Sequence, residues 1–147
     1  NYSDSMLLHS ETSTLVIPKK DGFDIKNDIT LKELCEYPVI FFEDRDPLYY
    51  GWCKNKFGQV PRNVKPRLVI NAFGQMLQAV SEGLGIAVIP THVLNRSRFK
   101  KDIKNFGTEF EFESSKFDFI FHNENKESLK IQTLFNFLHK EVNNLKV

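Results

Sequence analysis

The segment QMLQAVSEGLGIAVIPTHVL, residues 75–94, sets the order of elements on which the fold of this chain depends. Apolar side chains at helical spacing come first, then Gly83 and Gly85, and then the wholly apolar run 86–89. We predict a helix, a tight turn and a short buried strand. Gly83 can end the helix with a positive φ, Gly85 lets the helix and the strand approach closely, and Pro90 ends the strand because it has no N–H to donate.

A phosphate-binding loop is the alternative interpretation of these two glycines, and the order of the elements argues against it. A dinucleotide-binding fingerprint has a strand before its glycines and a helix after them, so that the N–H groups at the start of the helix face the phosphates. Here the helix comes before the glycines. The C-terminal end of a helix carries the negative end of its dipole, which repels an anion. We therefore interpret both glycines as structural.

Helices and strands alternate before this segment as well. A capping box, Thr30 with Glu33, opens one helix. Asp46 can cap a second helix, for which Pro47 suits the first position and Gly58 the end. The strands that we predict around these helices are residues 13–17, 39–42 and 67–71, and the helix of the opening segment is residues 73–82. Such alternation indicates an α/β lobe of three layers, with a mixed, mostly parallel sheet flanked by helices.

The last third of the chain has a different pattern. Phenylalanines alternate with polar residues, which predicts strands with one buried face: Phe110 and Phe112, then Phe117, Phe119 and Phe121. A final helix carries an apolar stripe of Leu129, Leu134, Phe135, Leu138, Val142 and Leu145. That stripe needs a partner surface, and these strands have no βα units of their own with which to complete a second sheet. We expect further residues before Asn1.

Composition narrows the class of protein. The chain of 147 residues suffices for one ordinary domain or for most of two small lobes. A formal net charge of +1 gives no sign of a nucleic-acid-binding surface, and we expect the basic run at residues 95–104 to be a solvated face. No apolar run approaches the ~20 residues of a membrane span, and no signal peptide is recognisable. Cys35 and Cys53 match no metal spacing, so we expect buried, reduced thiols in a cytoplasmic protein.

Catalytic chemistry finds no support in the sequence. The histidines lie far apart in the chain, at His9, His92, His122 and His139. No serine, cysteine or carboxylate pair forms a nucleophile or metal motif around them. Asp44 and Asp46 suit a helix cap and a salt bridge better than a general acid and base. We predict a protein that is not an enzyme and that has no catalytic residue, metal or cofactor.

The whole pattern resembles the effector-binding domain of LysR-type transcriptional regulators. LVIPKK resembles the strand that leaves the family's first lobe, and ITLKELCEYPVIFF is similar to the helix and strand that open the second lobe. INAFGQMLQAVSEGLGIAVIPTHVL resembles the family's helix, glycine turn and strand ending in proline. FDFIFHNENKESLKIQTLFNFLHKEV is similar to the return strand and the terminal helix that docks on the first lobe. The resemblance covers residues 15–142.

The resemblance implies a two-lobed fold of the periplasmic-binding-protein type II class. Residues 1–17 would be the end of lobe I and the first crossing, 18–100 lobe II, and 101–147 the return crossing with the last strand and helix of lobe I. Nothing matches the family's DNA-binding winged helix-turn-helix or the first part of lobe I. The resemblance thus implies a small-molecule effector as partner, a homodimer or higher homo-oligomer, no membrane, and DNA contact only through a missing N-terminal domain.

Carried over by position, three pieces of lobe II would face the effector. They are the loop Glu43, Asp44 and Arg45, the strand end and helix start at Asn71, Ala72 and Phe73, and the strand end at Thr91 and His92. Loops at the carboxyl ends of strands are where ligands gather in open α/β sheets. Free helix N–H groups and a bidentate arginine suit a carboxylate or another small organic anion. The alternative roles are that Asn71 only caps its helix and that Arg45 pairs with Asp44 or Asp46.

Two other functions remain open at this point. A solute-binding protein of transport has the same fold, and a lobe without a ligand could serve only for oligomerisation. A secretion signal or a helix-turn-helix upstream of Asn1 would distinguish transport from regulation. The two cysteines of the chain suggest no cystine framework, which favours the regulator.

Overall fold

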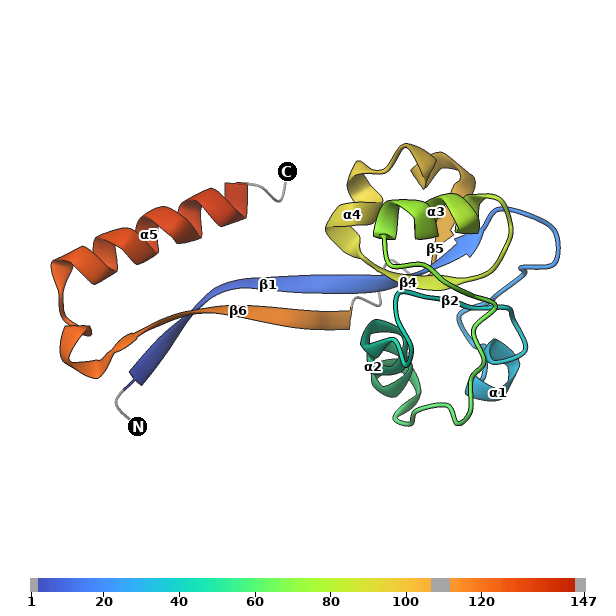
Figure 1. The fold of residues 1–147 in the computed structure, drawn as a ribbon, viewed down its shortest axis with the longest axis horizontal. Coiled ribbons are helices and arrows are strands. Elements are labelled where there is room, and N and C mark those ends of the chain that lie inside the picture. The colour runs from blue at the N-terminus through green and yellow to red at the C-terminus, as the bar shows by residue number, and fades with distance from the viewer. Residues whose placement is uncertain (1–2, 107–111, 145–147) are drawn as a thin grey trace. The chain divides into compact units, whose positions relative to one another are not determined.

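The computed structural model describes residues 3–106 and 112–144, and it divides into two compact units (Figure 1). The central unit is Thr12–Ser114, and the terminal unit is Asn1–Glu11 with Ser115–Val147. The elements in chain order are β1 (Ser3–Pro18), α1 (Leu31–Leu34), β2 (Ile40–Phe41), α2 (Pro47–Phe57), β3 (Leu68–Val69), α3 (Phe73–Ser81), β4 (Ala87–Pro90), α4 (Thr91–Arg96), the 3-10 helix η1 (Arg98–Asp102), β5 (Ile103–Asn105), β6 (Phe112–His122), the 3-10 helix η2 (Asn123–Asn125) and α5 (Leu129–Asn144). Within the described ranges no helix has the length and apolar character of a membrane span.

The sheet of the central unit is mixed. β1 runs antiparallel to β4, with Ser13 opposite Pro90, and antiparallel to β5 on its other side. β2 runs parallel to β3, and a parallel bridge between Val39 and Ile86 links β2 to β4. The mixed sheet is therefore confirmed, with its parallel pairings confined to β2, β3 and β4.

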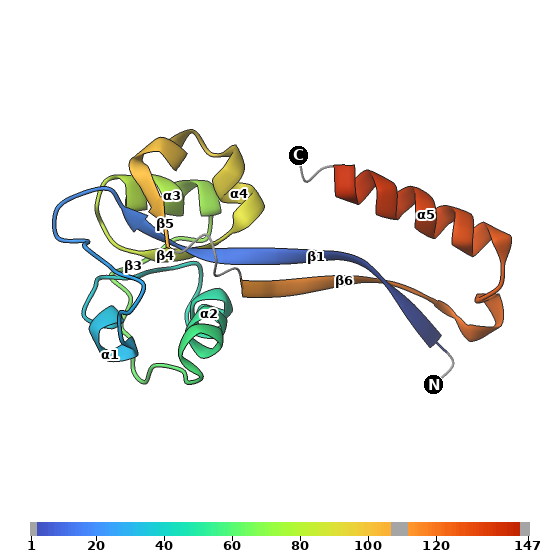
Figure 2. The same ribbon diagram turned by 180° about the vertical axis from the view of Figure 1, so that it is seen from behind.

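Helices cover both faces of this sheet, which makes three layers (Figures 1 and 2). Alternate residues of a strand point to opposite faces, so Leu15 and Ile17 pack towards α1 and α2 whereas Val16 packs towards α3. β4 does the same with Val88 and Ile89. All five side chains are fully buried. The predicted α/β lobe thus has two apolar core layers, one on each face of the sheet.

The local signals for helix ends are confirmed. The Thr30 hydroxyl accepts a hydrogen bond from the Glu33 N–H (3.2 Å), and the Glu33 carboxylate accepts one from the Thr30 N–H (2.8 Å). The Thr30 N–H and the Thr30 hydroxyl, which also donates to this carboxylate (2.8 Å), hold the pKa of Glu33 below its usual value. Gly58 and Gly83 follow α2 and α3 with φ of 72° and 82°, which only glycine adopts without strain. These ends need no tertiary contact to form.

The partner of Gly85 differs from the prediction. A Cβ at this position would lie 2.7 Å from the carbonyl oxygen of Pro38 and 3.2 Å from Cγ1 of Ile40. The backbone that approaches closely is therefore the start of β2, and the prediction that α3 would be the neighbour is wrong. Two hydrogen bonds hold this approach: Ile86 N–H donates to the Pro38 carbonyl (2.9 Å), and Ile40 N–H donates to the Ile86 carbonyl (2.8 Å).

Several strands have other bounds than the sequence predicted, and β2, for example, is limited to Ile40–Phe41. β1 begins at Ser3 rather than at residue 13, and β3 is limited to Leu68–Val69. The basic run 95–104 forms the end of α4, all of η1 and the start of β5, and its lysines and arginines are exposed, as a solvated face requires. A strand extends only as far as a neighbouring strand pairs with it through hydrogen bonds. These pairings, which a single sequence does not reveal, set the limits of β1 and β3.

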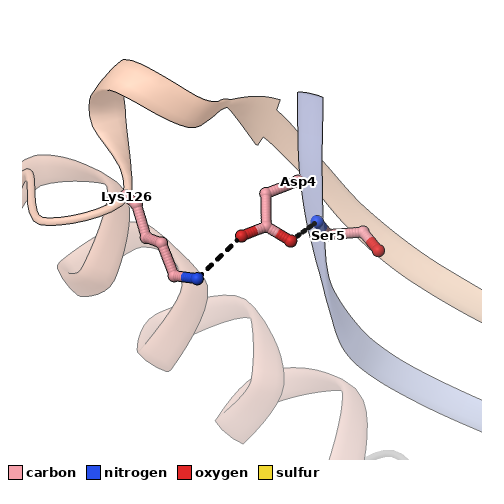
Figure 3. A network of polar contacts seen from close by, with 3 residues as sticks. All are labelled: Asp4, Ser5 and Lys126. Carbon is pink, nitrogen blue, oxygen red and sulfur yellow. Dashed lines mark hydrogen bonds and ion pairs between the residues drawn. The ribbon is translucent and has the colours of Figure 1, made fainter. Parts of the chain in front are cut away.

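The terminal unit consists of the first part of β1, most of β6, η2 and α5. β6 pairs with β1, Phe121 is buried, and Phe135 of α5 packs on Phe119 with ring centroids 6.0 Å apart. An ion pair joins Lys126 Nζ, which follows η2, to Asp4 near the start of β1 (3.0 Å), and the Ser5 N–H also donates to Asp4 (2.9 Å) (Figure 3). The hydrogen bond from Lys126 is the main reason why the pKa of Asp4 is lowered.

The predicted stripe of α5 is only partly covered. Of the stripe, Leu129 is 77% and Leu134 46% exposed; Phe137, which is not part of the predicted stripe, is 60% exposed, and no residue of α5 that the structure describes is buried. A shallow groove on this side is lined by Leu129, Lys130, Thr133, Leu134 and Phe137. The predictions for Phe110 and Leu145 lie outside the described residues. Phe135 of the stripe packs on β6, whereas Leu129 and Leu134 remain an exposed apolar face in the part of the chain that the structure describes.

Candidate functional site

The carboxyl ends of β2, β3 and β4 lie at one edge of the central sheet, because these strands are parallel. β1 enters at the same edge, since Ser13 lies opposite Pro90, the last residue of β4. We call this the carboxyl edge. The three predicted site segments, residues 43–45, 71–73 and 91–92, all follow strands that end here. The topology therefore brings them to one side of the lobe.

The first piece is the exposed turn 43–45 between β2 and α2. Arg45 has a φ of 56°, which a residue with a side chain rarely adopts. Asp46, which follows, is buried, and its carboxylate accepts hydrogen bonds from the Phe42 N–H (Oδ2, 2.7 Å) and the Leu48 N–H (Oδ1, 2.9 Å). Burial raises the pKa of Asp46, while these N–H donors oppose the rise. Asp46 therefore caps α2, as predicted, and its oxygens bind main-chain groups.

The second piece is the start of α3. The residue that caps α3 is Ala72, which makes no side-chain cap hydrogen bond to the helix start. The role of Asn71 as a cap is therefore wrong: it lies one residue too early and is exposed. Because the first intrahelical bond joins Met76 N–H to the Ala72 carbonyl (3.0 Å), the earlier N–H groups of the helix are available to an anion.

A ring pair joins these two pieces. The centroids of Phe42 and Phe73 lie 4.5 Å apart with the rings 29° from parallel, and both rings pack on the core beneath α3. Phe42 is the last residue before the turn 43–45, and Phe73 is the first residue of α3. Sequence reasoning placed Phe73 at the site but missed Phe42, because a pair of distant rings leaves no local signal.

The third piece, Thr91 and His92, begins α4. The Thr12 hydroxyl of β1 donates to the Thr91 hydroxyl (3.0 Å), so this strand end is fixed to the entering strand. His92 is exposed. Thr12 was missed by sequence reasoning, although the small polar run 12–14 directly before an apolar strand is a signal that could have been used.

Further hydroxyl groups line β1 beside Thr12. Ser13 is fully buried, and its hydroxyl donates a hydrogen bond to the hydroxyl of Ser114 (2.8 Å). The Thr14 hydroxyl donates to the Asn105 side-chain carbonyl. Burying a hydroxyl without a partner is costly, and here each one has a partner from β5 or β6. These residues hold the strands in register behind the carboxyl edge.

The two thiols do not provide a nucleophile. Both cysteines are free; Cys53 is buried, whereas Cys35 is exposed, which corrects the prediction that both are buried. Desolvation raises the pKa of Cys53 to about 12, and it also raises the pKa of Cys35. Thiols in this state are protonated at neutral pH and react slowly. In residues 3–106 and 112–144, no group of three or more His, Cys, Asp or Glu side chains is placed to hold a metal.

A three-layer lobe with loops gathered at the carboxyl ends of its parallel strands has the architecture of a periplasmic-binding-protein type II-like binding domain, as the resemblance implied. The chain belongs to the family of the LysR substrate binding domain, which matches residues 4–143. The resemblance to LysR-type regulators is thereby confirmed. A comparison with curated proteins finds no match.

Solved structures of LysR-type regulators share the fold. An OxyR mutant of Corynebacterium glutamicum is 12% identical with a TM-score of 0.63, covering 99% of this chain and 46% of that one. The AmpR effector domain of Pseudomonas aeruginosa is 13% identical with a TM-score of 0.59, covering 96% and 66%. The CcmR regulatory domain of Synechocystis PCC6803, in complex with 2-PG, is 17% identical with a TM-score of 0.64, covering 95% and 66%. The chain thus spans about half to two thirds of these chains.

Proposed function

We propose that this chain is the ligand-sensing part of a LysR-type transcriptional regulator, and that it binds a small-molecule effector at the carboxyl edge to control transcription. The observation that carries the proposal is the uncapped start of α3, which opens at the same edge as the turn 43–45. Membership of the LysR substrate binding domain family supports the regulatory role over solute transport. The 2-PG complex of the CcmR domain supports a small molecule as the ligand of this fold.

A small organic anion suits the edge best. The N–H groups at the start of α3 carry the positive end of the helix dipole, and Arg45 adds a guanidinium that can bind a carboxylate with two hydrogen bonds. Glu43 and Asp44, exposed beside Arg45, would select against an anion placed on their side of the turn. Thr91, half-buried, offers a hydroxyl, and His92 a ring, at the third strand end. Together with Asn71, Ala72 and Phe73, these are the residues that we propose for the effector site.

The same proposal assigns the parts of the protein. Residues 18–100 would be lobe II, and residues 1–17 and 101–147 would be the crossings with the last strand and helix of lobe I. The regulator would act in the cytoplasm as a homodimer or higher homo-oligomer, contacting DNA through a winged helix-turn-helix outside this chain. An effector would change transcription only if it binds one arrangement of the subunits better than another.

Arginine and asparagine variants of the full-length protein test the site. We expect Arg45→Ala and Asn71→Ala to weaken the response to the effector without unfolding the lobe, since both side chains are exposed. Small organic anions, 2-PG among them, are screened by the thermal shift that they cause, and the same shift is then measured for each variant. The exposed residues Arg62 and Asn55, substituted by alanine, are matched controls away from the edge. Equal stabilisation by the anion in wild type and both site variants would count against this site.

A further inference from the structure

We propose that Asp46 is a positioning residue for the effector, which ties both ends of the turn 43–45 to one carboxylate and so holds Arg45 towards the bound anion. The inference rests on the proposed function, and it adds a residue that neither contacts the effector nor belongs to the three pieces of the site.

The hydrogen bonds of Asp46 span the turn. Oδ2 accepts from the Phe42 N–H before the turn (2.7 Å), and Oδ1 accepts from the Leu48 N–H after it (2.9 Å). The three residues between Phe42 and Asp46 are exposed and pack on no core cluster that the structure describes. The conformation of the turn therefore depends on its two fixed ends, and one side chain fixes both.

A cap alone would not require this arrangement. A helix start needs one acceptor oxygen, which a serine hydroxyl supplies without burying a charge. Asp46 has an exposed fraction of only 1%, and the partners described for its carboxylate are N–H groups rather than a cation. Burying a carboxylate is costly. The second oxygen, bonded to Phe42, is the part of Asp46 that capping leaves unexplained.

Arg45 is the last residue of the turn 43–45, and its backbone conformation is unusual. Its φ of 56° lies in the left-handed region, which a residue with a side chain keeps only when its surroundings enforce it. Burial raises the pKa of Tyr50 in α2, and the positive charge of Arg45 opposes that rise. Because the backbone of Arg45 is held in the left-handed region, the turn restricts where the Arg45 side chain can start.

The hydrogen bonds of Asp46 also affect the start of α3. The residue whose N–H Asp46 binds, Phe42, stacks its ring on Phe73 at 4.5 Å. Phe73 is the first residue of α3, whose leading N–H groups have no side-chain cap. One buried carboxylate thus couples the position of the arginine to the position of the helix amides, which are the two groups suited to an anion.

Sulfate is the probe, because it carries the same charge throughout the neutral and weakly acidic range. Backbone NMR of the full-length protein follows a sulfate titration at the amides of Arg45, Phe73 and Gly74. The test variant is Asp46→Ser, which keeps a cap for α2 and removes the acceptor for Phe42. We expect it to weaken sulfate binding by about threefold to tenfold, as loss of an oriented charged hydrogen bond does. The amide and Cα shifts of Arg45 should also leave their left-handed values.

A double-variant cycle separates positioning from general damage. Arg45→Ala should weaken sulfate binding as well, and Asp46→Ser should cause a clearly smaller loss in that background than in wild type, because the part of its effect that acts through Arg45 is already gone. Asp46→Asn, which keeps the shape but leaves one N–H without an acceptor, repeats the test if the serine variant does not fold. Thr30→Ala, which removes the cap of α1 away from the edge, should leave sulfate binding unchanged.

The outcomes are distinct for the two proposals. Sulfate binding as tight in Asp46→Ser as in wild type, or an equal loss with and without Arg45, would overturn the positioning role alone. A wild-type chain whose amides at Arg45, Phe73 and Gly74 do not respond to sulfate would overturn the proposed site, and the positioning role with it.

Discussion

Replacing Gly85 by alanine tests the contact on which the junction of β2 and β4 depends. The added Cβ would lie 2.7 Å from the Pro38 carbonyl oxygen and 3.1 Å from its carbon. The two backbones would have to separate by about 0.7 Å to restore ordinary contact. Separation on that scale stretches the hydrogen bonds that join Ile86 to Pro38 and Ile40. Overpacking costs about 1–3 kcal/mol and a weakened hydrogen bond about 1 kcal/mol, so we expect a loss of about 2–4 kcal/mol.

Urea unfolding measures this loss, with the fluorescence of the buried Trp52 as the probe. At a slope of about 1–3 kcal/mol per molar urea, the midpoint should fall by about 1 M or more. Gly74→Ala is the matched control, since a Cβ there meets nothing within 4 Å and the change should stabilise α3 by about 0.5–1 kcal/mol. A change below about 0.5 kcal/mol for Gly85→Ala would refute the close approach of β2 and β4.

Two further predictions concern the ionisable groups of the central unit. Carboxyl NMR should find the pKa of Glu33 below, and that of Asp46 above, the usual range. The lowered pKa of Glu33 means that its capping box adds to the free energy of unfolding above the usual range of a glutamate, and this contribution is lost as the pH falls through the folded pKa. The raised pKa of Asp46 has the opposite effect: its contribution to the free energy of unfolding is largest when it is protonated and is lost as the pH rises through its folded pKa. In thiol labelling at neutral pH, Cys35 should react slowly and Cys53 only after unfolding, because Cys53 is buried; equal rates would contradict this.

The elements that sequence predicted well are those fixed by neighbours in the chain. Thr30 with Glu33, Asp46 with Leu48, and Gly83 each act within four residues, and the structure confirms all three. Helix caps and left-handed turns depend on local geometry, so the identity of the residues is enough to place them.

What sequence could not predict depends on residues far apart in the chain. The partner of Gly85 is Pro38, the partner of Thr91 is Thr12, and the ring on Phe73 is Phe42. Each contact exists because the strand order brings two segments together, and one sequence carries no trace of that order. The exposure of Cys35 is a further case, since the sequence predicted a buried thiol there.

The direction of α3 explains why the glycine turn is structural while its flanks suit a ligand. Gly83, with a φ of 82°, turns the chain back so that β4 runs opposite to α3 along the sheet. The start of the helix and the end of the strand therefore lie at the same edge, and the turn lies at the other. The positive end of the helix dipole faces the carboxyl edge beside Phe73, and the negative end faces the glycines. The helix dipole thus favours an anion at the edge where we propose the effector site and disfavours one at the glycine turn.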